Sequence, residues 1–102
     1  HPRVRRQRQM CIRDRLVSFK QCFGHEFGIK SIGIFGSVAR QENREDSDLD
    51  IVVDIDNPTL STMYTLKTVL TEMFHCEIDL VRFRSSLSPF LKQNIEKEAI
   101  YV

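Results

Sequence analysis

Apolar residues recur every three or four positions in three segments of the chain, which is the spacing of amphipathic helices. The first segment begins at Leu16 and loosens at Gly24 and Gly28. The second follows a turn at residues 57–59, and the third begins at Ser88-Pro89, where serine is a good cap and proline suits the first helical position. The apolar positions are Leu16, Phe19, Cys22, Phe23 and Phe27 in the first; Leu60, Met63, Leu66, Leu70, Met73 and Phe74 in the second; and Phe90, Leu91 and Ile95 in the third.

Three shorter segments have the apolar and β-branched composition of strands. They cover residues 31–35, 48–55 and 76–81, and the second is the most strongly apolar. Residues 38–42 fit one turn of helix, and residues 43–47 are polar and acidic, as in a loop. Helices and strands therefore alternate, which predicts an α/β or α+β two-layer domain with helices packed on a small mixed sheet.

Length and composition agree with one small domain. The chain has 102 residues, of which 41% are hydrophobic and 28% charged. No apolar stretch approaches the roughly 20 residues that cross a bilayer, and no apolar signal-peptide segment opens the chain. Three cysteines without paired spacing argue against a disulfide framework or a zinc site and suit a reducing compartment. We therefore expect a cytoplasmic protein without a membrane partner.

The charge is uneven along the chain. Residues 1–15 hold six arginines and one acid, whereas residues 16–102 hold nine basic and thirteen acidic residues, a net of about −4. A basic arm is typical of a nucleic-acid-binding tail. The run from Arg5 to Asp14, however, resembles the in-frame translation of a transposase adapter used in preparing sequencing libraries. We therefore expect residues 1–15 to be a non-native leader before a domain at 16–102, with the true amino terminus and about one helical turn missing. The acidic balance of that domain argues against direct nucleic-acid binding.

Two carboxylates leave one face of the predicted strand at 48–55. Asp48 and Asp50 are two residues apart, so their side chains are neighbours on the sheet. At 4 Å such a pair repels by about 4 kcal/mol at an effective dielectric near 20, so it needs a cation or a shared proton. Asp79 is a third acid, placed between apolar residues of the next strand. The three residues predict a divalent metal site, although each alone also fits a solvated strand acid.

An anion site is expected just upstream. Gly36-Ser37 follows a strand and opens a possible helix, where unpaired backbone N–H groups favour a phosphate. Arg40, one turn further on, can reach the same anion. A Gly-Ser turn alone is ordinary, but an anion cradle beside clustered acids suits metal-nucleotide chemistry. A calcium loop at residues 46–57 is excluded, because Ile51 and Asn57 replace the glycine and the glutamate that it requires.

The combined string resembles the signature of the DNA polymerase β-type nucleotidyltransferase superfamily, in which Gly-Ser is followed after ten residues by Asp-x-Asp. Here residues 38–47 are those ten. The match is closest to the minimal branch, the small prokaryotic nucleotidyltransferases often encoded beside a HEPN-domain partner as antitoxin and toxin. It covers residues 16–102 and includes the strand with Asp79. One departure is Gln41, which stands where the family usually has glycine after arginine.

The resemblance implies a Mg²⁺-dependent protein adenylyltransferase that uses ATP. Asp48 and Asp50 would hold two Mg²⁺ ions, and Asp79 would share one and help to deprotonate the acceptor hydroxyl. Gly36 and Ser37 would bind the triphosphate, with Arg40 as a further candidate. The reaction would be an in-line displacement at the α-phosphorus that leaves AMP on the acceptor.

The acceptor must come from another chain, because about 87 residues suffice only for the nucleotide half of such an enzyme. For the minimal branch this implies AMP transfer to a tyrosine of a HEPN toxin, with the chain as a type VII-like antitoxin in a hetero-oligomer. The exposed faces of the second and last helices are expected docking surfaces. Two alternatives stay open: a non-catalytic partner-binding antitoxin with a vestigial metal site, and a small-molecule, antibiotic-modifying nucleotidyltransferase.

Overall fold

A computed structural model of the chain describes residues 2–41, 48–84 and 87–102, with side chains described from residue 8 onward. Helices and strands alternate along it, as the sequence predicts. The elements in order are α1 (Pro2–Phe27), β1 (Ile29–Phe35), α2 (Gly36–Ala39), β2 (Leu49–Ile55), α3 (Leu60–Phe74), β3 (Ile78–Arg82), α4 (Pro89–Glu98) and β4 (Ile100–Tyr101).

The four strands form one mixed sheet in the order β3-β2-β1-β4. β1 is antiparallel to both β2 and β4, and β2 is parallel to β3. Gly33 of β1 pairs with Tyr101 of β4, and a Cβ at this glycine would meet the Ile100 carbonyl oxygen at 2.6 Å. The two-layer α/β domain with a small mixed sheet is therefore confirmed.

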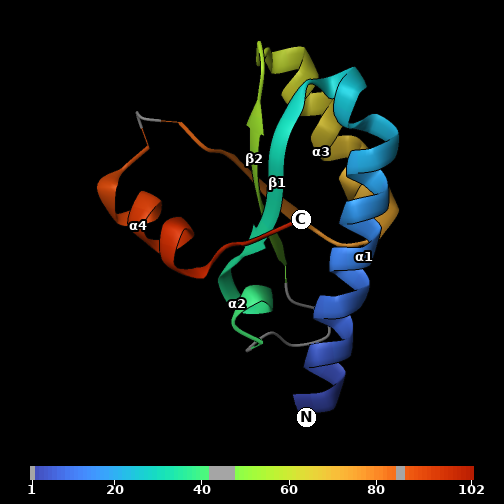
Figure 1. Cartoon of the computed structure of the whole chain (residues 1–102), viewed down its shortest axis with the longest axis vertical. Coiled ribbons are helices and arrows are strands. Elements are labelled where there is room, and N and C mark those ends of the chain that lie inside the picture. The colour runs from blue at the N-terminus through green and yellow to red at the C-terminus, as the bar shows by residue number, and fades with distance from the viewer. Residues whose placement is uncertain (1, 42–47, 85–86) are drawn as a thin grey trace.

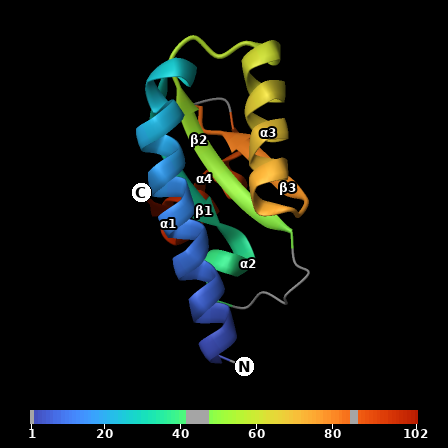
Figure 2. The same cartoon turned by 90° about the vertical axis from the view of Figure 1, so that its right-hand side faces the viewer.

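Helices cover the two faces of the sheet unequally. α1 and α3 lie side by side on one face, and α4 lies alone on the other (Figures 1 and 2). The larger core joins Leu16 of α1 and Leu66 of α3 to Ile51 of β2. The smaller core joins Val52 of β2 to Ile95 of α4. Because side chains of a strand alternate between faces, Asp50 points to the same face as Val52, where α4 packs.

Side-chain caps fix the starts of α3 and α4 where the sequence predicts them. The Thr59 hydroxyl accepts a hydrogen bond from the backbone N–H of Thr62 at 3.0 Å. The Ser88 hydroxyl likewise accepts from Leu91 N–H at 3.3 Å, and Pro89 takes the first helical position. Each cap satisfies one of the donors that a helix start leaves unpaired.

The first helix differs from its prediction. α1 begins at Pro2 instead of Leu16, and it continues through Gly24 to Phe27. Ile12 and Gln9 of the segment that we excluded are buried against the domain. The non-native origin of residues 1–15 is not tested by this packing and stays a prediction. Smaller differences include β4, which the sequence did not predict, β1, which begins two residues earlier than expected, and β3, which begins two residues later.

No helix in the described ranges combines the length and apolar character needed to cross a bilayer.

Candidate functional site

Strand pairing brings two of the three predicted acids together. In the parallel β2–β3 ladder, Asp50 is the register partner of Asp79. Asp50 is partly buried and Asp79 is exposed. Asp48 is exposed and lies immediately before β2, so its charge still reaches Asp50. The three carboxylates therefore interact electrostatically at one end of the sheet.

The Gly-Ser turn lies directly against this acid pair. Asp50 is also the register partner of Phe35 in β1, and the chain turns at the next residue, Gly36. Gly36 has a φ of 71°, which L side chains rarely adopt. A Cβ there would overlap the Asp50 carboxylate, whose Cγ would lie 3.0 Å away. Only glycine fits, because it alone permits both the backbone conformation and the close approach.

Crowding changes the protonation of Asp50. Burial, the charge of Asp79, a hydrogen bond to Asp79 and the charge of Asp48 raise the pKa of Asp50 from 3.8 to about 6, whereas Arg40 lowers it. Removal from water and like charge both disfavour the ionised form. Acids crowded in this way need a cation or a shared proton, and the raised pKa of Asp50 agrees with that expectation.

The chemistry of the side-chain oxygens decides whether these residues fit Mg²⁺. Carboxylate oxygens are the ligands that Mg²⁺ prefers, and a cation would relieve the repulsion at Asp50. Within the described parts of the chain, no group of three or more His, Cys, Asp and Glu side chains is close enough to hold a metal ion. The structure thus supplies a pair, Asp50 and Asp79, and the role of Asp48, two residues before Asp50, as a further ligand stays a prediction. The pair fits the ion.

Ser37 and Arg40 follow Gly36 in the same turn. Both belong to the region of α2, where Ser37 is partly buried and Arg40 forms the C-cap, its backbone N–H bonded to the Gly36 carbonyl oxygen at 3.1 Å. The Arg40 side chain crosses to α4, where Nη1 lies 2.9 Å from Oε2 of Glu98. Sequence reasoning missed Glu98, because it lies outside the motif and no spacing rule links it to Arg40.

A second residue that the sequence analysis missed supports the turn from α1. Gln9 is only 6% exposed, and its Nε2 donates to the carbonyl oxygens of Ala39 at 3.0 Å and Val38 at 3.3 Å. The side chain of Gln41 in turn donates to Oε1 of Gln9 at 3.3 Å. Gln9 went unnoticed because it lies in the segment excluded as a leader.

The backbone of Gln41 adopts a conformation that favours glycine, the residue that the resemblance leads us to expect at this position. Gln41 has a φ of 59°, in the left-handed region where residues with a Cβ are strained. The hydrogen bond to Gln9 partly offsets this strain.

Comparison with known proteins shows the family of this chain. The family model described as polymerase beta, nucleotidyltransferase, matches residues 18–102. The chain belongs to this nucleotidyltransferase family. The resemblance drawn from the spaced motif is thereby confirmed.

Two sequence relatives of this nucleotidyltransferase are named as protein adenylyltransferases. A candidate protein adenylyltransferase of Methanocaldococcus jannaschii is 35% identical over 92 residues, which cover 89% of this chain and 94% of the relative. The protein adenylyltransferase MntA of Thermococcus cleftensis is 36% identical over 88 residues, which cover 85% of this chain and 88% of the relative.

Solved structures agree with the fold. A candidate minimal nucleotidyltransferase superposes with a TM-score of 0.75 at 33% identity, over 90% of this chain and 93% of the other. A crystal structure of a toxin-antitoxin with AMP-PNP matches with a TM-score of 0.70 at 22% identity, over 87% of this chain and 70% of that one. The second match supports the fold alone.

Proposed function

We propose that this nucleotidyltransferase transfers AMP from ATP to a hydroxyl of a partner protein in a Mg²⁺-dependent reaction. The single observation that carries the proposal is the seating of Gly36 against Asp50, with Asp79 as the register neighbour of Asp50. This arrangement puts an open backbone turn, suited to phosphate, beside carboxylates that require a cation. The relatives named as protein adenylyltransferases support the choice of AMP and of a protein acceptor.

Each residue of the site has a role in this reaction. Asp50 and Asp79, with Asp48 beside them, would hold two Mg²⁺ ions. When bound, Mg²⁺ neutralises charge on the phosphates and on the attacking oxygen. Gly36 lets the triphosphate approach the backbone, and Ser37 and Arg40 donate hydrogen bonds to it.

The bond changes follow from in-line geometry. The acceptor hydroxyl gives up its proton to a carboxylate oxygen of Asp79 and forms a bond to the α-phosphorus. The bond between the α-phosphorus and the oxygen that bridges to the β-phosphorus breaks, and pyrophosphate leaves. Holding the two reacting groups in one geometry supplies much of the rate.

The partner that we propose is a HEPN toxin, modified on a tyrosine, so that the chain acts as a type VII-like antitoxin in the cytoplasm. One structural neighbour, 21% identical, is a MNT antitoxin in complex with a tri-AMPylated HEPN toxin from Shewanella oneidensis. Large apolar side chains are exposed on the two helices expected to dock: Leu60 at 92% and Tyr64 at 75% on α3, and Phe90 on α4. They offer contact area for a protein acceptor.

The non-native origin of residues 1–15 is part of the same proposal. The family match begins at residue 18, which supports it, and the burial of Gln9 and Ile12 does not test it. Sequencing the locus from intact genomic DNA tests it directly: a different upstream sequence is expected, and an unchanged one would overturn this part of the proposal.

Labelled ATP, Mg²⁺ and the HEPN protein encoded beside this gene test the activity. We expect label on the partner with the wild-type chain and none with Asp50→Asn. A non-catalytic antitoxin would instead neutralise the toxin equally well with Asp50→Asn, and a small-molecule enzyme would label no protein.

A further inference from the structure

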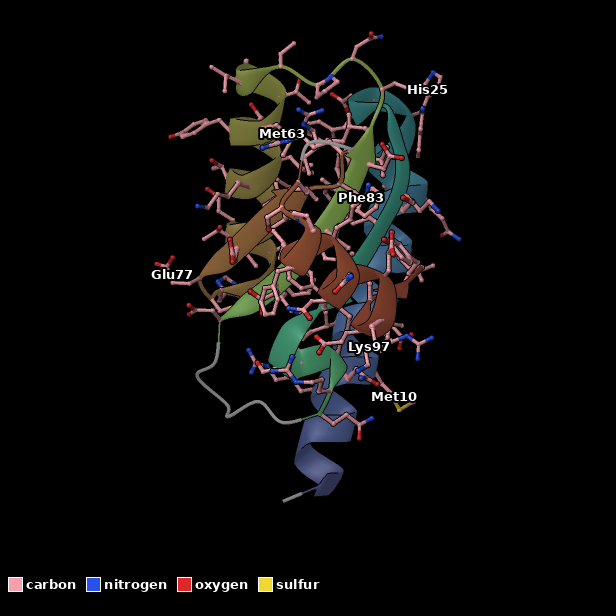
Figure 3. The ribbon with its side chains drawn as sticks, turned by 90° about the vertical axis from the view of Figure 1, so that its left-hand side faces the viewer. Met10, His25, Met63, Glu77, Phe83 and Lys97 are labelled. Atoms are coloured by element: carbon pink, nitrogen blue, oxygen red, sulfur yellow. The ribbon has the colours of Figure 1, made fainter. Side chains whose placement is uncertain are left out.

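The ion pair between Arg40 and Glu98 ties the nucleotide-binding turn to α4. Nη1 of Arg40 lies 2.9 Å from Oε2 of Glu98, and the two side chains are 42% and 23% exposed. The C-terminal turn of α4, marked by Lys97 in Figure 3, lies beside α2. Glu98 is the last residue of that helix.

Arg40 also acts on the acid pair at the same time. Its positive charge is the one influence that lowers the pKa of Asp50, against the burial and the like charges that raise it. The guanidinium group therefore lies between two sets of carboxylates, those on β2 and β3 and that of Glu98. A mobile cation beside crowded carboxylates is attracted onto them, where it competes with a divalent ion.

We infer that Glu98 is a positioning residue, which holds Arg40 on the α4 side of the acid pair so that the guanidinium meets the nucleotide phosphates without occupying the metal-binding carboxylates. Glu98 itself touches no substrate in this scheme and acts only through Arg40. The planar guanidinium suits this role, because its several N–H donors can bind a carboxylate on one edge and a phosphate on another. The inference rests on the proposed function, since it concerns acids that take Mg²⁺.

The test measures binding of Mn²⁺ alone, followed by electron paramagnetic resonance, so that it does not depend on AMP transfer. Four chains are compared: wild type, Glu98→Gln, Arg40→Gln and the double variant. Glu98→Gln keeps the length of the side chain and a hydrogen-bond acceptor but removes the charge that holds Arg40. We expect it to weaken Mn²⁺ binding about three- to fivefold, in keeping with the strength of a partly exposed ion pair.

The comparison with Arg40→Gln distinguishes the positioning of Arg40 by Glu98 from a direct effect of the Glu98 charge on Mn²⁺ binding. With Arg40 replaced, Glu98→Gln should have no more effect than Glu96→Gln, a matched change on the same helix. Glu98→Asp keeps the charge but shortens the side chain, so it should weaken Mn²⁺ binding about twofold. An equal effect of Glu98→Gln with and without Arg40, or no effect at all, would overturn the inference.

Two further outcomes keep the inference distinct from the proposed function. A wild-type chain that binds no Mn²⁺ and transfers no AMP would overturn both. A wild-type chain that transfers AMP, with Glu98→Gln folded by circular dichroism and unchanged in Mn²⁺ affinity, would overturn the inference alone.

Discussion

Gly36 and Asp50 are in such close contact that a single added carbon on Gly36 would overlap the Asp50 carboxylate. The positive φ of Gly36 makes the same position unfavourable for any L side chain. The turn and the acid are therefore one unit, and a change at either residue displaces the other.

Gly36→Ala should accordingly abolish AMP transfer, with a loss of at least a hundredfold, and destabilise the fold by about 1 to 3 kcal/mol through backbone strain and the clash. Chemical denaturation and a labelled-ATP assay measure the two effects. Ser37→Ala is the matched control, because it removes one hydroxyl without altering the backbone; it should keep the stability within about 0.5 kcal/mol. A fully active Gly36→Ala would contradict the placement of the turn.

Asp50→Asn should stabilise the metal-free protein while removing its activity. The pKa of Asp50 in the fold, about 6, lies above its ordinary value of 3.8, so ionisation opposes folding. Below pH about 4 the group is protonated in both states and costs nothing; the cost grows as the pH rises to 6 and is then constant. Asp50 is only partly buried, so solvent screens its charge. The free energy of unfolding gained by Asp50→Asn is therefore about 1 kcal/mol above pH 6.

Urea denaturation with a chelator at pH 4.5 and 7.5 measures this gain. It should be larger at pH 7.5, whereas Asp54→Asn, further along the same face of β2, should not reproduce it. A gain confined to pH 4.5 would contradict the assigned direction.

Gln9→Ala should cost about 2 kcal/mol. The change leaves the partly buried carbonyl oxygen of Ala39 without the donor that Gln9 supplies, whereas that of Val38 still accepts from the Gln41 backbone N–H at 3.1 Å. An unpaired buried polar group costs about 1 to 3 kcal/mol. Met10→Ala, at a neighbouring side chain that is 54% exposed, should cost less than about 0.5 kcal/mol. Equal effects of the two changes on the free energy of unfolding would show that α1 does not support the turn.

At position 41 a glycine variant should be more stable than an alanine variant, which reverses the usual order of stability of these two residues. Both Gln41→Gly and Gln41→Ala lose the hydrogen bond to Gln9, so they differ only in backbone preference. Because residue 41 has a φ of 59°, the glycine variant should be the more stable by about 1 kcal/mol. Thermal denaturation of the two variants side by side measures the difference, and a more stable alanine variant would contradict the left-handed conformation.

The sequence predicted those parts of the protein that local rules determine. Periodic apolar positions gave α3 and α4, and the caps at Thr59 and Ser88 gave their first residues. The spacing from Gly36-Ser37 to Asp50 identified the turn and its acid, because the motif connects them directly along the chain.

Tertiary relationships could not be predicted in the same way. Glu98 meets Arg40 only because α4 packs beside α2, and no spacing along the chain encodes a contact across 58 residues. Gln9 was not predicted as a site residue, because its segment resembles a sequencing-adapter translation and was therefore excluded from the fold. Asp48 shows another limit: its place two residues before Asp50 predicts a joint metal ligand, which stays a prediction, whereas only the strand register shows that Asp79 is the partner of Asp50.

The most direct test of the account is mass spectrometry of the HEPN protein encoded beside this gene, after incubation with the chain, ATP and Mg²⁺. We predict AMP on a tyrosine of that protein, lost with Asp50→Asn and with Asp79→Asn but kept with Asp54→Asn. An unmodified partner with the wild-type chain, or a modified partner with Asp50→Asn, would contradict it.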